Sequence, residues 1–297
     1  MRTLGYLIGR NTKLFFKDKG TLFTAMVAPL ILLLLFITFL GKVYEDSFHS
    51  SVPSNIDVPE SIIDGFVGGW LFSSLLAVCC VTVAFSANMI MVQDKVTGAR
   101  DDITIAPVKR SVIGLSYYVS TALITGIICY ITTAVGFIYL SQVGWYLSTQ
   151  DALLVIVDVF IMVLFGTAFS SLVCFFLTSQ GGIAAVSTII SAAYGFVCGA
   201  YMPIAQFSES IQNFITCLPG TYGTVLLHKH LMGGSLMEME EEYFPKEVVD
   251  VIKDGFDNNL YFMDNKVEIW QMYLVLVGTI VILVGLYVIF NILKKRG

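Results

Sequence analysis

Few side chains in this sequence have the types and spacings that perform chemistry. The chain contains no GxxxxGKS/T phosphate-binding loop, no HExxH zinc motif and no GxSxG nucleophile motif. Most of its six cysteines lie in apolar runs, and none repeats the CxxC spacing of metal sites. Cysteines in such runs usually pack as small apolar residues. We therefore expect neither a metal framework nor a structural disulfide.

Asp158 lies within the apolar run LLVIVDVFIMVLF, where an ionised carboxylate is costly. It must therefore face a cavity or a partner, or be protonated. One interpretation is a proton-coupling or cation-binding site. The other is a polar residue near one membrane face that bonds to a neighbouring Ser, Thr or Tyr. His228 and His230 are two positions apart and would diverge on a helix, so we expect interface histidines rather than a metal site.

The second polar feature is the segment 94–110, which lies between two apolar runs and mixes both signs of charge. Its length favours a short helix parallel to a membrane, ended near Pro107. Exposed charges on that helix would dock a soluble partner by complementary charge. The alternative is a plain link between two spans. The candidate residues are Asp94, Lys95, Gly98, Arg100, Asp101, Asp102, Pro107 and Arg110.

The elements that position these residues are apolar. The chain is 56% hydrophobic and 13% charged, with a mean hydropathy of +0.80, whereas a soluble domain averages roughly 25% charged residues. A helix needs about 20 apolar residues to cross the hydrocarbon core. The sequence therefore predicts one all-α integral membrane domain over residues 1–297, with six transmembrane helices near 22–40, 70–92, 112–140, 152–177, 183–202 and 269–293.

The basic residues predict the orientation of these spans. Most of the 17 Lys and Arg residues fall before the first span, in the segment 94–110, or after the last span. By the positive-inside rule, both termini and that segment are expected to be cytoplasmic, as an even number of spans requires. The C-terminal group is Lys294, Lys295 and Arg296.

Two flanking segments have patterns of their own. Residues 3–18 alternate apolar and basic positions, which favours an amphipathic helix in the cytoplasmic interface over a soluble tail. Residues 203–267 are expected on the outer side. Their first part is apolar but interrupted by Pro203 and Pro219, which suggests short re-entrant helices covered by protein. Their second part, residues 238–264, is acidic and expected to be solvated.

Taken in order, these features resemble the membrane subunits of type-2 ATP-binding-cassette (ABC-2) exporters. The resembling motifs are Arg10-x-x-Lys13-x-Phe15-Phe16-Lys17-Asp18 before Ala28-Pro29-Leu30, then Asp94-x-x-x-Gly98-x-x-x-Asp102 with Ala106-Pro107-Val108-x-Arg110, and lastly Gly199-x-x-x-Pro203-Ile204, Leu218-Pro219 and Leu231-x-Gly233. They are similar, respectively, to the connecting helix, the coupling helix and the outer re-entrant region of that family. The acidic part of residues 203–267 is longer than the link expected there.

The resemblance implies a multi-pass permease of a bacterial plasma membrane, in contact with lipid and without a nucleic-acid partner. It would pair with a second permease subunit, a copy or a paralogue. A separate cytoplasmic ATPase would bind ATP and Mg, and this chain itself would bind no cofactor. Arg10, Lys13, Phe15, Phe16 and Lys17 would belong to the connecting helix.

The cargo class implied by the resemblance is a drug, a toxin or a lipid-like amphiphile, exported from the cell. Candidate path residues are polar or aromatic positions in the spans, although helix packing explains these types equally well. They are Phe72, Ser74, Phe85, Asn88, Asp158, Ser191 and Tyr194. The competing hypotheses are a proton- or ion-coupled secondary transporter that uses Asp158, and a membrane enzyme. The sequence shows no inverted repeat for the first and no convergent polar cluster for the second.

Overall fold

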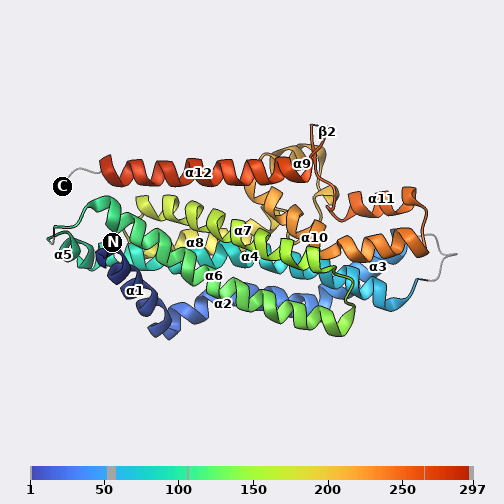
Figure 1. Cartoon of the computed structure of the whole chain (residues 1–297), viewed down its shortest axis with the longest axis horizontal. Helices are drawn as coiled ribbons and strands as arrows, with labels where there is room; N and C mark the ends of the chain where they lie inside the picture. The colour runs from blue at the N-terminus through green and yellow to red at the C-terminus, as the bar shows by residue number, and fades with distance from the viewer. Residues whose placement is uncertain (1, 52–57, 106, 264, 294–297) are drawn as a thin grey trace.

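The computed structural model describes residues 2–51, 58–105, 107–263 and 265–293. Within these residues, six helices are long and apolar enough to cross a membrane. They run side by side in one elongated bundle (Figure 1). The predicted all-α membrane fold with six spans is therefore confirmed. Ala106, Lys294, Lys295 and Arg296 lie outside the described residues.

The elements follow one another with few long loops. In chain order they are α1 (Arg2–Lys17), α2 (Lys19–Leu35), the π-helical turn η1 (Phe36–Leu40), α3 (Gly41–Ser51), α4 (Glu60–Val96), α5 (Ala99–Ile105), α6 (Arg110–Val143), α7 (Thr149–Phe176), α8 (Gln180–Val197), the 3-10 turn η2 (Ile204–Gln206), α9 (Glu209–Thr216), α10 (Pro219–Glu242), α11 (Lys246–Gly255), the two-residue strands β1 (Tyr261–Phe262) and β2 (Asn265–Lys266), and α12 (Ile269–Leu293).

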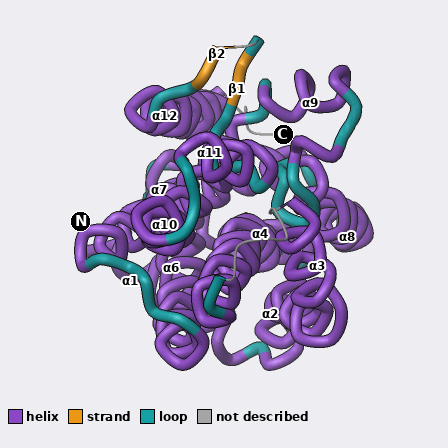
Figure 2. Tube along the Cα trace, turned by 90° about the vertical axis from the view of Figure 1, so that its right-hand side faces the viewer, coloured by secondary structure: helices purple, strands orange, loops and turns teal. Residues whose placement is uncertain are grey.

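Helix α4 is the central helix of the bundle. It packs against α2, α6, α7, α8 and α10, and these helices surround it in Figure 2. Its side chains are buried over nearly its whole length, as in a helix that is apolar on every face. Any displacement of α4 would therefore also displace side chains of most of the other spans.

The outer helices present apolar side chains to the surroundings. Leu34 of α2 is 60% exposed, Ile189 of α8 is 63% exposed and Val281 of α12 is 66% exposed. Side chains of this kind cover the exposed faces of all three helices. Such surfaces suit contact with hydrocarbon or with another apolar subunit rather than with water.

The first span continues beyond the apolar run that predicts it. Asp18 caps α2 by accepting hydrogen bonds from the backbone N–H groups of Gly20 and Thr21. The helix passes through Pro29 and then widens into η1, where the Gly41 N–H bonds to the Phe36 carbonyl five residues earlier. It resumes as α3, which buries Tyr44 and Phe48 against the bundle.

Helices α1 and α5 lie at one end of the bundle, and α3 and α11 lie at the other (Figure 1). We call these the α5 end and the α11 end. Gly98, with φ +80°, provides the reversal between α4 and α5. The predicted short helix before Pro107 is α5.

The segment 203–267 is more helical than its sequence suggests. Pro219 occupies the first turn of α10, a position that lacks a helical hydrogen-bond partner in any case, so it starts a 24-residue helix rather than interrupting one. Helix α10 is buried against α4, α7 and α12. Most of the acidic stretch forms the end of α10 and the amphipathic α11, which buries Val249 and Ile252; Asp264 lies outside the described residues.

Candidate functional site

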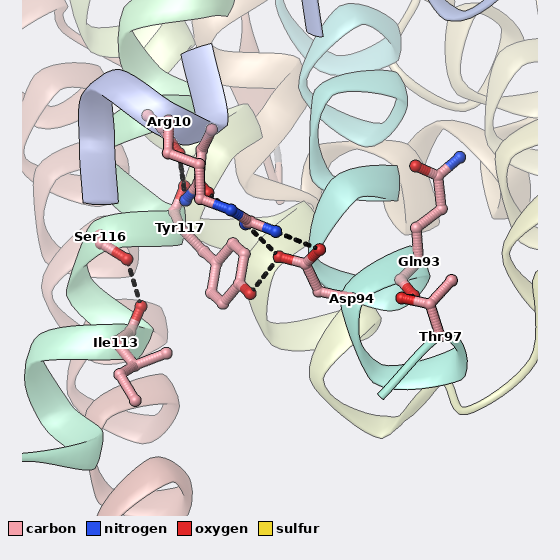
Figure 3. A network of polar contacts seen from close by, with 9 residues as sticks. Arg10, Gln93, Asp94, Thr97, Ile113, Ser116 and Tyr117 are labelled. Carbon is pink, nitrogen blue, oxygen red and sulfur yellow. Dashed lines mark hydrogen bonds and ion pairs between the residues drawn. The ribbon is translucent and has the colours of Figure 1, made fainter. Parts of the chain in front are cut away.

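A charged clamp joins three helices at the α5 end (Figure 3). Arg10 of α1 places Nη1 2.5 Å from Oδ2 of Asp94 and Nη2 2.9 Å from Oδ1, so the guanidinium donates to both carboxylate oxygens. The Tyr117 hydroxyl of α6 also donates to Oδ2, at 2.6 Å. Asp94 is 6% exposed and lies in the last turns of α4. Forked, charge-assisted bonds of this type are strong and fix orientation.

The same helix α1 is held by a buried face. Phe15 is fully buried, and Asn11 donates from Nδ2 to Ser120 Oγ at 3.4 Å. Arg10 Nη1 also donates to the Asn11 side-chain oxygen at 3.0 Å. The hydrogen bond with Asp94 raises the pKa of Arg10 above its ordinary value, against the opposing effect of burial. The guanidinium is therefore a permanent charge in the clamp.

Three other predicted residues of α1 lie away from the clamp. Lys13, Phe16 and Lys17 are exposed on the remaining face of the helix. The helix thus has one side against α4 and α6 and one basic, partly aromatic side that faces outward. This is the arrangement expected of a helix at a membrane interface.

Lys95, the next residue after Asp94, binds the end of α7. Its Nζ donates to the carbonyls of Cys174 and Phe175 at 2.8 Å each and of Leu177 at 3.1 Å. The last carbonyls of a helix have no intrahelical partner and carry the negative end of its dipole. Lys95 therefore caps α7 from α4.

Arg100 links α5 to the last span. Its Nη2 donates to Asn291 Oδ1 of α12 at 3.3 Å, and the Asn291 side chain donates to the Tyr287 carbonyl at 2.8 Å. The Tyr287 hydroxyl in turn donates to the carbonyl of Gly114 in α6, at 3.0 Å. Residues 94–100 thus contact α1, α6, α7 and α12.

The expectation that Lys95 and Arg100 present exposed charges differs from the structure. Both are half-buried because their charged groups bond within the protein. Asp101 and Asp102 are exposed on α5, with Ile105, which is 84% exposed and was not singled out from the sequence. Pro107 is exposed and Arg110 half-buried at the start of α6. The free surface of α5 is therefore acidic and apolar.

Most candidate path residues are packed inside the bundle. Phe72, Ser74, Phe85, Asn88 and Tyr194 are all buried. Asn88 Nδ2 donates to the hydroxyls of Ser170 at 2.6 Å and Ser171 at 3.1 Å, and the Thr121 hydroxyl donates to the Asn88 oxygen at 3.1 Å. These contacts join α4, α6 and α7, as the helix-packing interpretation expects.

Ser191 instead lines a cleft of about 1000 Å³ between α2 and α8, floored by Ser86 and Met89 of α4. Its walls extend along α2 from Thr24 to η1 and α3, and none of the described residues that line it is charged. Hydroxyl groups are contributed by Thr24, Tyr44, Ser86, Ser187, Thr188, Ser191 and Tyr201. The sequence could not reveal this cleft because its walls come from segments about 160 residues apart.

Asp158 lies in a buried polar cluster of α7, α10 and α12. The Tyr273 hydroxyl donates to Oδ1 and His230 Nδ1 bonds to Oδ2, each at 2.5 Å. The tyrosine matches the second interpretation of this carboxylate, whereas the histidine was not expected as its partner. His228, which points elsewhere, packs edge-on to Trp70 with ring centroids 5.5 Å apart.

Comparison with known proteins identifies the family. The model of a family described as ABC-2 family transporter protein matches residues 46–289, most of the chain. A comparison with curated proteins found no match. The matched region includes the second to fifth spans in full and most of the sixth, together with α5, α10 and α11. The chain therefore belongs to the ABC-2 family of transporter proteins.

Proposed function

We propose that this protein is the permease subunit of an ATP-driven exporter and that a separate cytoplasmic ATPase docks on α5 and α1. The observation that carries this proposal is the set of bonds at the α5 end. A short helix with an exposed acidic and apolar face lies beside a junction bonded to α1, α6, α7 and α12. An ATPase that moved α5 would thereby move several spans together. ATP and Mg would bind to that partner.

The cleft between α2 and α8 supports an amphiphilic cargo. The described residues of its walls combine apolar side chains with hydroxyl groups and carry no charge. A lipid-like molecule, drug or toxin with a large apolar part would therefore bind there favourably. Ser191, which lines the cleft, would then belong to the path. The other candidate path residues would then act through packing.

A second permease subunit, a copy or a paralogue, is part of this proposal. Helices α2 and α8 are among the least buried spans and form the two sides of the cleft. A partner subunit across this opening would enclose the cleft. With the basic residues of α1 on the cytoplasmic side, the α11 end would face outward from a bacterial plasma membrane.

The surroundings of Asp158 give less support to a proton-coupled transporter. Both oxygens of the carboxylate already bond to side chains of neighbouring helices. A coupling carboxylate needs a path to water and freedom to change partners, and Asp158 is only 1% exposed.

The decisive experiment is purification of the tagged chain in mild detergent, with mass spectrometry and an ATPase assay of the complex. We expect an ABC ATPase to co-purify. The double variant Asp101→Lys with Asp102→Lys should lose it, because it reverses the charge on the exposed face of α5. The matched control, Glu242→Lys with Glu247→Lys at two exposed positions of the opposite end, should retain it. A chain that purifies alone and transports under a proton gradient would contradict the proposal.

A further inference from the structure

We propose that Asp158, His230 and Tyr273 are positioning residues that fix α10 to α7 and α12, so that these three helices move as one unit during transport. We call this cluster the Asp158 lock. The inference rests on the proposed transport function. It assigns a role to Asp158, which belongs neither to the proposed docking site at the α5 end nor to the cleft between α2 and α8.

The geometry of the lock is directional. Each carboxylate oxygen of Asp158 bonds to a different helix, Oδ1 to Tyr273 of α12 and Oδ2 to His230 of α10. Asp158 is 1% exposed and His230 is 6% exposed, so water does not compete for the bond between them, whereas Tyr273 is half-buried. One side chain therefore sets the position of two helices relative to a third.

The contacts of α10 with α4 and α7 also include close-packed backbone and apolar contacts. A Cβ added to Gly69 of α4 would overlap the carbonyl of Leu231, and one added to Gly223 would overlap the Met162 side chain of α7. Such close packing holds the helices together. The lock adds hydrogen bonds that join one side chain of α7 to both α10 and α12.

Separating α10 from α7 would leave the Asp158 side chain without its bond to His230. Removing a hydrogen-bond partner from a buried polar group is destabilising because water cannot replace that partner, and Asp158 lies within a membrane span. Rearrangement during a transport cycle is therefore expected elsewhere. On the cleft side, the hydroxyls of Tyr44 and Tyr201 donate to the backbone carbonyls of Tyr201 and Ser191, so the bonds between these lining residues involve no charged group.

The first test requires neither a partner nor a substrate. Hydrogen exchange is measured on the full chain in lipid nanodiscs for wild type, His230→Leu and His230→Asn. The asparagine can replace the Nδ1 contact, whereas the leucine cannot. We expect exchange in residues 219–242 to rise by about tenfold or more in His230→Leu, and to stay near wild type in His230→Asn. Unchanged exchange in His230→Leu would overturn the lock.

The second test asks whether α10 and α7 must separate during transport. Cysteines replace Met162 and Gly223, which face each other, in a chain that also carries Cys217→Ser to remove the exposed native thiol. Transport by the complex with its ATPase is compared before and after oxidation to the Met162→Cys to Gly223→Cys disulfide. Retained transport is the expected result, and transport that is lost on oxidation and regained on reduction would overturn the proposal.

The two tests separate the lock from the transport proposal. If no ATPase co-purifies and no variant transports, the exporter assignment fails. The hydrogen-exchange result still decides whether the lock exists.

Discussion

Asp94 and Lys95 are neighbours in the sequence, but their side chains leave α4 in different directions. Successive residues of a helix differ by about 100° around its axis. Asp94 therefore reaches Arg10 and Tyr117, while Lys95 reaches the end of α7. The sequence identified both residues as candidates because they belong to the segment 94–110, which mixes both signs of charge between two apolar runs. It could not identify their partners, since Arg10 is 84 positions away from Asp94.

The clamp predicts the order of stability of three proteins that differ at position 10: wild type, Arg10→Lys and Arg10→Ala. Arg10→Ala leaves the Asp94 carboxylate buried with Tyr117 as its remaining partner in the clamp. The guanidinium is one-third exposed, so we expect a loss of about 1–3 kcal/mol in stability rather than the full cost of breaking a buried pair. Arg10→Lys keeps the charge but not the fork, and should fall between Ala and wild type. Thermal unfolding in detergent measures the order.

The controls for this prediction follow from exposure and charge. Lys13→Ala, on the exposed face of the same helix, should leave the unfolding temperature unchanged. Adding Asp94→Asn to Arg10→Ala should recover part of the loss, because it removes the uncompensated charge. A double variant less stable than Arg10→Ala would show that the clamp is not an ion pair.

Asp257, near the α11 end, makes the stability of the folded protein depend on pH. Burial raises the pKa of its carboxyl from 3.8 to about 7, against the opposing effect of backbone hydrogen bonds from Ile204 and Ala205. The folded protein thus keeps a proton that the unfolded chain releases near pH 4. The stabilising contribution is fully present below about pH 4 and is lost as pH rises through about 7. At most it amounts to a few kcal/mol, since one pKa unit corresponds to about 1.4 kcal/mol.

We therefore expect the unfolding temperature of wild type to fall between about pH 5 and pH 8. Asp257→Asn should reduce that slope, because the amide does not titrate. Glu247→Gln, on the exposed face of α11, should keep it. Equal slopes in Asp257→Asn and wild type would contradict the assignment of the buried proton to Asp257.

At the scale of elements, the spans were predictable and the helices of the segment 203–267 were predictable only in part. A membrane requires long apolar helices, so hydropathy alone located all six spans. Helix α10 is covered by other helices rather than by lipid, so it tolerates His, Lys and Gly and has no apolar run of its own. Pro219 resembled a break, but at the first turn of a helix proline is favourable.

The link between α4 and α7 predicts a local effect. Lys95→Met keeps much of the side-chain volume but removes the donor to the carbonyls of Cys174, Phe175 and Leu177. The end of α7 should then fray, and hydrogen exchange in residues 174–182 should increase. Lys109→Met, at an exposed position before α6, is the matched control and should leave exchange there unchanged. Equal protection in both variants would show that Lys95 does not cap α7.

At the scale of the whole molecule, burial separates residues that look alike in the sequence. Ser74 and Ser191 both lie in apolar spans, yet Ser74 is fully buried in α4 and Ser191 faces the cleft. Small polar residues serve packing and solute contact equally well. Which role each one has depends on whether its helix is central or peripheral, and hydropathy does not carry that information because both kinds of helix are apolar.

The π-helical turn η1 sets the rotational phase of the first span. Its hydrogen bond from Gly41 to Phe36 closes a turn one residue longer than that of an α-helix, so η1 acts as a single-residue insertion. Every side chain after it is turned by about 100° relative to an uninterrupted helix. This phase places the Tyr44 hydroxyl 2.8 Å from the carbonyl of Tyr201, with its ring against Trp70. The apolar stripe of α2 and the buried face of α3 are therefore out of register by one residue. A homologous chain that lacks one residue of η1 would need a different partner for Tyr44.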